Sequence, residues 1–138
     1  MDFHNGTIKV LTSGAKAGNA NYDLQPPQGR RYKIIACRWS ITTDATVASR
    51  YTLMSFYDGA TNIGYLSANT TAVTASQTKY TDCTQYEVSN SAGAKDLGNV
   101  GIGDYWISTY SVYTRFSLLN GVAGDSWSVS VVVSEIPE

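Results

Sequence analysis

The chain has 138 residues, of which 43% are apolar and 15% are charged, and its formal net charge is −1. This length indicates a single domain that can bury a core without disulfide or metal staples. The near-neutral charge argues against a dedicated nucleic-acid-binding protein, which would carry a clear basic excess, and no apolar run approaches the roughly 20 residues that a membrane helix needs.

The N-terminal segment differs in character from the rest of the chain. Residues 7–11 could form a strand, but residues 13–21 are small and polar without periodicity, which is typical of a linker. Pro26 and Pro27 then fix an extended backbone, and Gly29 permits a turn.

We therefore predict an N-terminal arm or linker over residues 1–25 and a β-sandwich domain over residues 26–138. An arm that folds onto a neighbouring molecule would add contact area without disturbing the core. The sequence leaves open the alternative in which residues 7–11 form the first strand at a sheet edge.

Beyond this segment the chain alternates apolar and small polar residues in short runs, and no long amphipathic helix is indicated. We expect strands over residues 31–43, 50–57, 63–66, 79–88, 105–113, 114–119 and 126–134. The Asp58-Gly59 dipeptide predicts a hairpin because glycine tolerates the positive φ that such turns require. The glycine-containing residues 89–103 are expected to form a long loop.

Two of these strands show which side faces the core. In the last strand Trp127 and three valines alternate with serines, so the apolar side should face inward. In the first strand the better core face is Lys33, Ile35, Cys37, Trp39 and Ile41. Cys37 should therefore be a buried thiol, and the sequence leaves open whether it pairs with Cys83.

Seven or eight strands joined by hairpins and longer crossings favour an all-β fold, an antiparallel Greek-key β-sandwich, of which the jelly roll is the eight-strand version. An immunoglobulin-like sandwich is the main competitor. It is disfavoured because Trp39 lies two residues after Cys37 on the same predicted strand.

The sequence contains little that could support catalysis or metal binding. Its one histidine, His4, lies in the predicted arm, so a Ser-His-acid triad is not expected. Asp44, Asp58, Asp104 and Asp125 all lie at predicted turns, where aspartate caps backbone groups. Two cysteines and one histidine do not complete a zinc set. We expect no catalytic residue, no metal site and no cofactor.

A succession of motifs resembles a known class of protein. Pro-Pro-x-Gly-Arg-Arg-Tyr-Lys-Ile-Ile at residues 26–35 leads into a strand, and Thr-Thr-Asp-Ala-Thr-Val-Ala-Ser-Arg follows at residues 42–50. Gly-Asp-Ser-Trp at residues 124–127 precedes the final alternating strand. Together these features resemble small virion proteins of tailed bacteriophages with a jelly-roll fold, of the head-decoration or cement type.

The resemblance implies a non-enzymatic capsid protein, often trimeric, that binds the major capsid protein and sits on the capsid surface of the virion. The resemblance transfers no catalytic residue. We expect no partner among nucleic acids, membranes or small-molecule ligands. The residues expected to contact the capsid are in the arm, namely Phe3, Ile8, Val10 and Leu11. Because residues 1–5 lack signal-peptide features, we expect synthesis in the host cytoplasm.

A second hypothesis is a carbohydrate-binding β-sandwich, free-standing or in a phage fibre. Tyrosine and tryptophan supply rigid contact area with a polar tip and often mark sugar-binding surfaces. Tyr57, Tyr65 and Trp106 are the candidates for such a platform.

Overall fold

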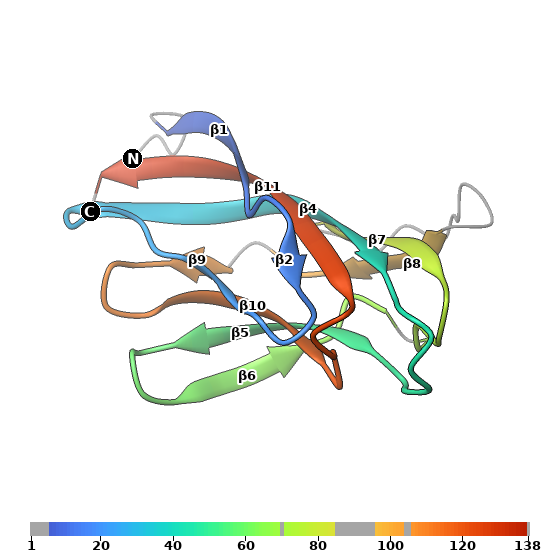
Figure 1. Ribbon diagram of the computed structural model, residues 1–138. Coiled ribbons are helices and arrows are strands. Elements are labelled where there is room, and N and C mark those ends of the chain that lie inside the picture. Colours follow the sequence, from blue (N-terminus) through green and yellow to red (C-terminus); the bar gives the residue numbers. More distant parts are fainter. Residues whose placement is uncertain (1–5, 70, 85–95, 104–105, 138) are drawn as a thin grey trace.

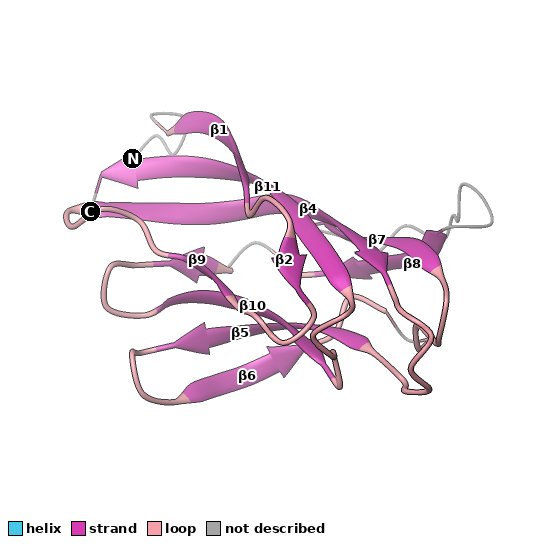
Figure 2. Cartoon of the chain, in the orientation of Figure 1, coloured by secondary structure: helices cyan, strands magenta, loops and turns pink. Residues whose placement is uncertain are grey.

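The computed structural model describes residues 6–69, 71–84, 96–103 and 106–137, and within these ranges it consists of strands, turns and loops (Figures 1 and 2). The strands are β1 (Thr7–Thr12), β2 (Lys16–Ala17), β3 (Tyr22–Leu24), β4 (Arg30–Thr42), β5 (Tyr51–Tyr57), β6 (Asn62–Leu66), β7 (Thr78–Thr84), β8 (Asp96–Gly101), β9 (Ile107–Ser108), β10 (Tyr113–Leu119) and β11 (Ser126–Pro137). None of the described elements is a helix that could cross a membrane.

The strands form two sheets that face each other (Figure 1). Sheet A has the order β1-β11-β4-β7-β8, with the short β2 paired to β11 and β9 paired to β4. Sheet B has the order β3-β10-β5-β6. All pairs are antiparallel except β7 with β8, which is parallel.

Eight of these strands pair in a nested order. Leaving aside β2, β8 and β9, the first strand pairs with the last (β1 with β11), the second with the seventh (β3 with β10), the third with the sixth (β4 with β7) and the fourth with the fifth (β5 with β6). This nesting across two four-stranded layers is the pairing of a jelly roll. The predicted all-β antiparallel sandwich of the jelly-roll type is confirmed.

The N-terminal segment belongs to this scheme. All six residues of β1 pair with β11, and β3 pairs with β10 at the edge of sheet B. Residues 7–24 therefore supply the first and second of the eight strands, so the edge-strand alternative describes them and a detached arm does not. The reason is pairing at long range: the partners of β1 lie more than 100 residues away, beyond the reach of local pattern analysis.

The predicted core face of the first long strand is correct in its second half and wrong in its first half. Cys37, Trp39 and Ile41 are buried, but so are Tyr32 and Ile34, whereas Lys33 and Ile35 are only partly buried. The register between β4 and β11 shifts, because Val132 pairs with Ala36 and Val133 with Ile34. Ile35 is the extra residue of a β-bulge, which turns the two halves of the strand to opposite phases.

Two other predicted elements differ from the structure. The expected loop over residues 89–103 contains β8, which pairs with β7, while residues 85–95 lie outside the described ranges. Of the expected strand over residues 105–113, Ile107–Ser108 form β9 in sheet A and Tyr113 begins β10 in sheet B, with a turn between them, while residue 105 lies outside the described ranges. The turn is closed by the backbone N–H of Thr109, which donates to the carbonyl of Val112 at 2.7 Å.

The core fills the space between the sheets and is rich in aromatic contacts. The Trp39 ring lies 5.1 Å from that of Trp127 within sheet A and 5.4 Å from that of Phe116 in sheet B. All three side chains are at most 1% exposed. The predicted inward alternation of β11 is confirmed, because Trp127 and the three alternating valines are buried.

The predicted hairpin is also confirmed. It joins β5 to β6, and the Asp58 carboxylate accepts the backbone N–H groups of Ala60 and Thr61 at 2.9 and 2.7 Å. These backbone bonds lower the pKa of Asp58. Gly59 has a φ of 94°, the conformation that favours glycine.

Candidate protein-interaction surface

The outer face of sheet A carries aliphatic side chains at one edge. In β1, Leu11 packs against the core, so the alternation of a strand places Ile8 and Val10 on the outer side. Ile8 is 60% exposed and Val10 is 69% exposed. An exposed edge strand that carries aliphatic side chains is prone to pair with or be covered by another chain.

The strand register extends these two side chains into a row. Val10 pairs with Val132 of β11, and Val132 pairs with Ala36 of β4. Val132 and Ala36 are partly buried and lie on the same outer side as Val10. We call Ile8, Val10, Val132 and Ala36 the apolar row.

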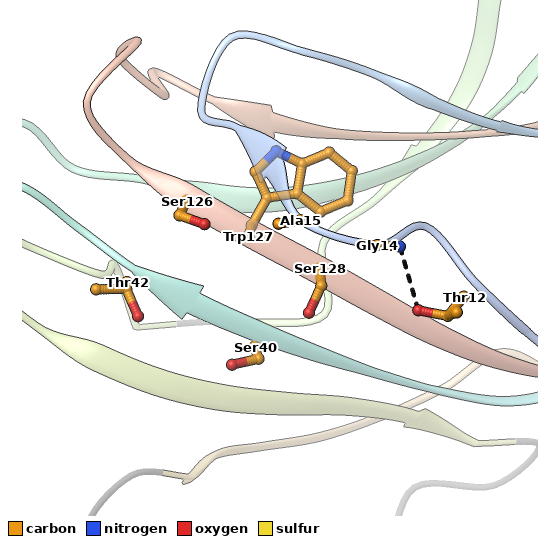
Figure 3. Close-up of a pocket in the computed structure, with 8 residues that line it drawn as sticks. All are labelled: Thr12, Gly14, Ala15, Ser40, Thr42, Ser126, Trp127 and Ser128. Carbon is orange, nitrogen blue, oxygen red and sulfur yellow. Dashed lines mark hydrogen bonds between the residues drawn. The ribbon is translucent and has the colours of Figure 1, made fainter.

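Beside the apolar row the same face is rich in hydroxyl groups. A hollow of about 240 Å³ lies between the segment that follows β1 and strands β4 and β11. Its lining residues are Thr12, Gly14, Ala15, Ser40, Thr42, Ser126, Trp127 and Ser128 (Figure 3). In Figure 3 the Ser126 and Ser128 side chains leave β11 on the side opposite to the Trp127 ring, which is buried in the core.

This face also carries an ion pair, Arg38–Asp82, whose opposite charges cancel. Arg38 and Asp82 are cross-strand partners, and the guanidinium donates two hydrogen bonds of 2.7 Å to the carboxylate. The guanidinium carbon also lies 5.9 Å from the centre of the Tyr80 ring. Because the two charges are paired, covering this ion pair with another protein costs less free energy than covering an unpaired charge would.

The predicted contact residues are placed as follows. Ile8 and Val10 are exposed in the apolar row, Leu11 is turned inward against the core, and Phe3 lies outside the described residues. Val132 and Ala36 were not predicted. Val132 could have been suspected, because it is the one outward valine in the run of three that interrupts the serine alternation of β11.

The three predicted sugar-platform rings do not come together. Tyr57 lies on the outer face of sheet B, where the Arg115 guanidinium carbon is 3.6 Å from the centre of its ring. Trp106 stacks on Phe56 with ring centres 4.6 Å apart, and its indole N–H donates to the Thr114 hydroxyl at 2.9 Å. Phe56 precedes Tyr57 in β5, and successive side chains of a strand point to opposite faces.

Tyr57 and Trp106 therefore belong to opposite faces of sheet B and cannot form one flat platform. Tyr65 is 61% exposed on the edge strand β6, at a register irregularity where Gly64 has a φ of 69°. Local sequence spacing could not reveal this separation, because it depends on which side of the sheet each ring occupies.

The turn aspartates serve the fold, as predicted. Arg50 is fully buried and donates two hydrogen bonds of 3.0 Å to Asp125 and one of 3.2 Å to Asp44. Asp125 also accepts the backbone N–H groups of Asp44 and Val122 at 2.9 and 3.0 Å. Asp104 lies outside the described residues.

Within the described ranges, no three or more His, Cys, Asp and Glu side chains are grouped so that they could hold a metal ion. The outer face of sheet A offers aliphatic side chains, hydroxyl groups and the Arg38–Asp82 ion pair.

Comparison with known proteins adds one distant structural match. No protein-family model matches the sequence, and no curated protein matches it. A chain in the structure of the infectious bursal disease virus Gx strain is 13% identical, with a TM-score of 0.26. The match covers 96% of this chain and 40% of the viral chain, and it is too distant to support an argument on fold or function.

Proposed function

We propose that this chain is a structural protein of a virus particle, of the capsid decoration or cement type, which binds the major capsid protein and stabilises the head shell of a bacteriophage. The observation that carries the proposal is the apolar row, in which Ile8 and Val10 are 60% and 69% exposed beside a hydroxyl-rich face with a self-neutralised ion pair. A cement protein stabilises a shell by mass action, because it binds the assembled state in preference to free subunits.

The physical case for a protein partner rests on what the surface would gain. Covering the Ile8 and Val10 side chains removes apolar area from water, which is worth about 25 cal/mol per Å². Covering the neighbouring serines and threonines costs less than covering charged groups, provided that each hydroxyl finds a partner. The major capsid protein and further copies of this chain, as a homotrimer, are the proposed partners.

Cosedimentation with shells assembled from the major capsid protein of the virus that encodes this chain tests the proposal. The wild-type chain should pellet with the shells, and the double variant I8S/V10S should bind more than about tenfold more weakly, because contacts at the centre of an interface dominate affinity. The matched control is Val47→Ser, since Val47 is 93% exposed in the β4–β5 loop and is not part of the apolar row.

Each result is informative. If the wild-type chain does not pellet, the proposed function is wrong. If the wild type and I8S/V10S bind equally, the capsid is bound through another surface. Light scattering coupled to size exclusion would show whether the free chain is a trimer, as a decoration protein often is, or a monomer.

The carbohydrate alternative now depends on a different place from the three rings. The hollow on sheet A is lined by five hydroxyl side chains, which can both donate to and accept from sugar hydroxyls. A glycan array with the wild-type chain tests this alternative. Binding that Ser128→Val abolishes would support it, and an array without hits would exclude the glycans displayed.

A further inference from the structure

Three sulfur atoms meet in the core between the two sheets. Cys37 of β4 and Cys83 of β7 are direct cross-strand partners in sheet A, and both side chains point inward, being 3% and 0% exposed. The Sγ atoms of Cys37 and Cys83 lie 3.9 and 3.5 Å from the Sδ atom of Met54, which faces them from sheet B. Both thiols are free in the structure.

The strand pairing brings the two cysteines within reach of a covalent bond. Directly opposed residues of an antiparallel pair have Cβ atoms about 4.5–5.5 Å apart. A disulfide needs Cα atoms about 4.4–6.8 Å apart and Cβ atoms about 3.5–4.5 Å apart. Cys37 and Cys83 share one face of the sheet, so a small approach of β4 and β7 meets the requirement.

We propose that Cys37 and Cys83 form a cross-strand disulfide when the chain meets a low-molecular-weight disulfide oxidant such as oxidised glutathione. The thiolate of one cysteine attacks a sulfur of the oxidant and releases one reduced glutathione. The second cysteine, once deprotonated, attacks the protein sulfur of this mixed disulfide and releases a second reduced glutathione. The protein loses two protons and two electrons, and the oxidant gains them.

The surroundings of the thiols determine when this reaction can occur. The hydrogen bond with Cys83 and burial raise the pKa of Cys37 well above its usual value, so the folded chain holds Cys37 as the unreactive thiol. Because both cysteine side chains are at most 3% exposed, an oxidant reaches them only through a transient opening of β7 or while the chain is folding. The disulfide should form slowly in the native protein and rapidly during refolding.

The bond would join the third and sixth of the eight strands. It closes the segment from Cys37 to Cys83, which contains the whole β5–β6 hairpin of sheet B. Closing so long a segment restricts the unfolded chain more than the folded one. The melting temperature should therefore rise by about 5–15 °C on oxidation of a domain of this size. This inference is independent of the proposed function.

The experiment uses the full chain, purified under reducing conditions and then incubated with oxidised glutathione. Intact mass spectrometry should show the loss of two hydrogens without a glutathione adduct. A peptide map without reductant should join the peptides that contain Cys37 and Cys83. The melting temperature should rise, and dithiothreitol should reverse the rise. Cys37→Ala and Cys83→Ala are the matched controls, since neither can form the bridge.

If the native chain resists oxidation, refolding from denaturant in the presence of oxidised glutathione tests whether Cys37 and Cys83 form the disulfide. A bridged chain that melts above the reduced chain supports the proposal. Glutathione adducts on separate cysteines, bridges between chains, free thiols after refolding, or a bridged chain that melts below the reduced one would each overturn it. None of these readouts involves capsid binding, so failure here leaves the proposed function untouched.

Discussion

Two of the arginine–aspartate pairs in the molecule, Arg50–Asp125 and Arg115–Asp23, each form two hydrogen bonds but lie in opposite surroundings. At the loop end of the sandwich, Arg50 and Asp125 form two hydrogen bonds of 3.0 Å, and both side chains are fully buried. On the outer face of sheet B, Arg115 and Asp23 form bonds of 2.7 and 2.8 Å with side chains 20% and 34% exposed. Hydrogen-bond length alone would rank the second pair as the stronger one.

Burial reverses that ranking for the effect of losing a partner. Water can solvate Arg115 or Asp23 if the other is removed, whereas an orphaned Asp125 or Arg50 would stay buried and poorly solvated. The buried pair is also fully used by the fold, since Arg50 contacts Asp44 and the carbonyl of Ala48 in addition to Asp125. The comparison shows that the environment, more than the contact distance, sets the energetic weight of an ion pair here.

The largest effect is therefore expected at the buried pair. Asp125→Asn removes the main counter-charge of Arg50 and should lower the free energy of unfolding by about 3–5 kcal/mol. Urea unfolding monitored by tryptophan fluorescence measures this, with Asp23→Asn as the matched control because it makes the same chemical change on the exposed pair. Equal losses in the two variants would contradict the distinction drawn between them.

A dependence on pH is expected from the same carboxylate. Burial opposes the ionisation of Asp125, but the N–H of Val122, the Arg50 guanidinium and the N–H of Asp44 outweigh it and lower its pKa. The pKa of an aspartate carboxyl in the unfolded chain is about 4. The ionised form therefore stabilises the fold above this pH, and the contribution is lost as the pH falls from about 4 through the lower folded-state pKa.

Stability measured from pH 7 to pH 2 should thus fall steeply below about pH 4 in the wild type and less steeply in Asp125→Asn. Some slope should persist in the variant, because the pKa of Asp58 is also lowered. Parallel curves for the two proteins would show that Asp125 has the same pKa in the folded and unfolded chains.

The sequence predicted those parts of the fold in which one face of a strand is distinctly apolar. The serine–valine alternation of β11 and the Asp58-Gly59 turn both have a single interpretation, and the structure confirms both. The first half of β4 has apolar residues on both faces, namely Tyr32 and Ile34 against Ile35, so its phase is decided by pairing with β11 and not by its own pattern.

The candidate site was predictable only in part for a related reason. Ile8 and Val10 stand out as aliphatic residues in a polar segment, and the structure places both on the surface. Their neighbours Val132 and Ala36 come from strands far away in sequence, so only the register joins them into one row. The separation of Tyr57 from Trp106 likewise depends on the opposite sides of sheet B, which spacing along the chain does not specify.

The smallest effect is expected at the exposed pair. Asp23→Asn should cost about 0–1 kcal/mol, because solvent screens the charges and water replaces the lost hydrogen bonds of Arg115. The guanidinium keeps its contact with the Tyr57 ring at 3.6 Å, a contact worth about 0.5–1 kcal/mol at an exposed site. Arg115→Ala should therefore destabilise more than Asp23→Asn, since it removes the aspartate bond and the ring contact together. If Asp23→Asn were the more damaging variant in urea unfolding, the carboxylate and not the tyrosine ring would be what holds Arg115 on this face.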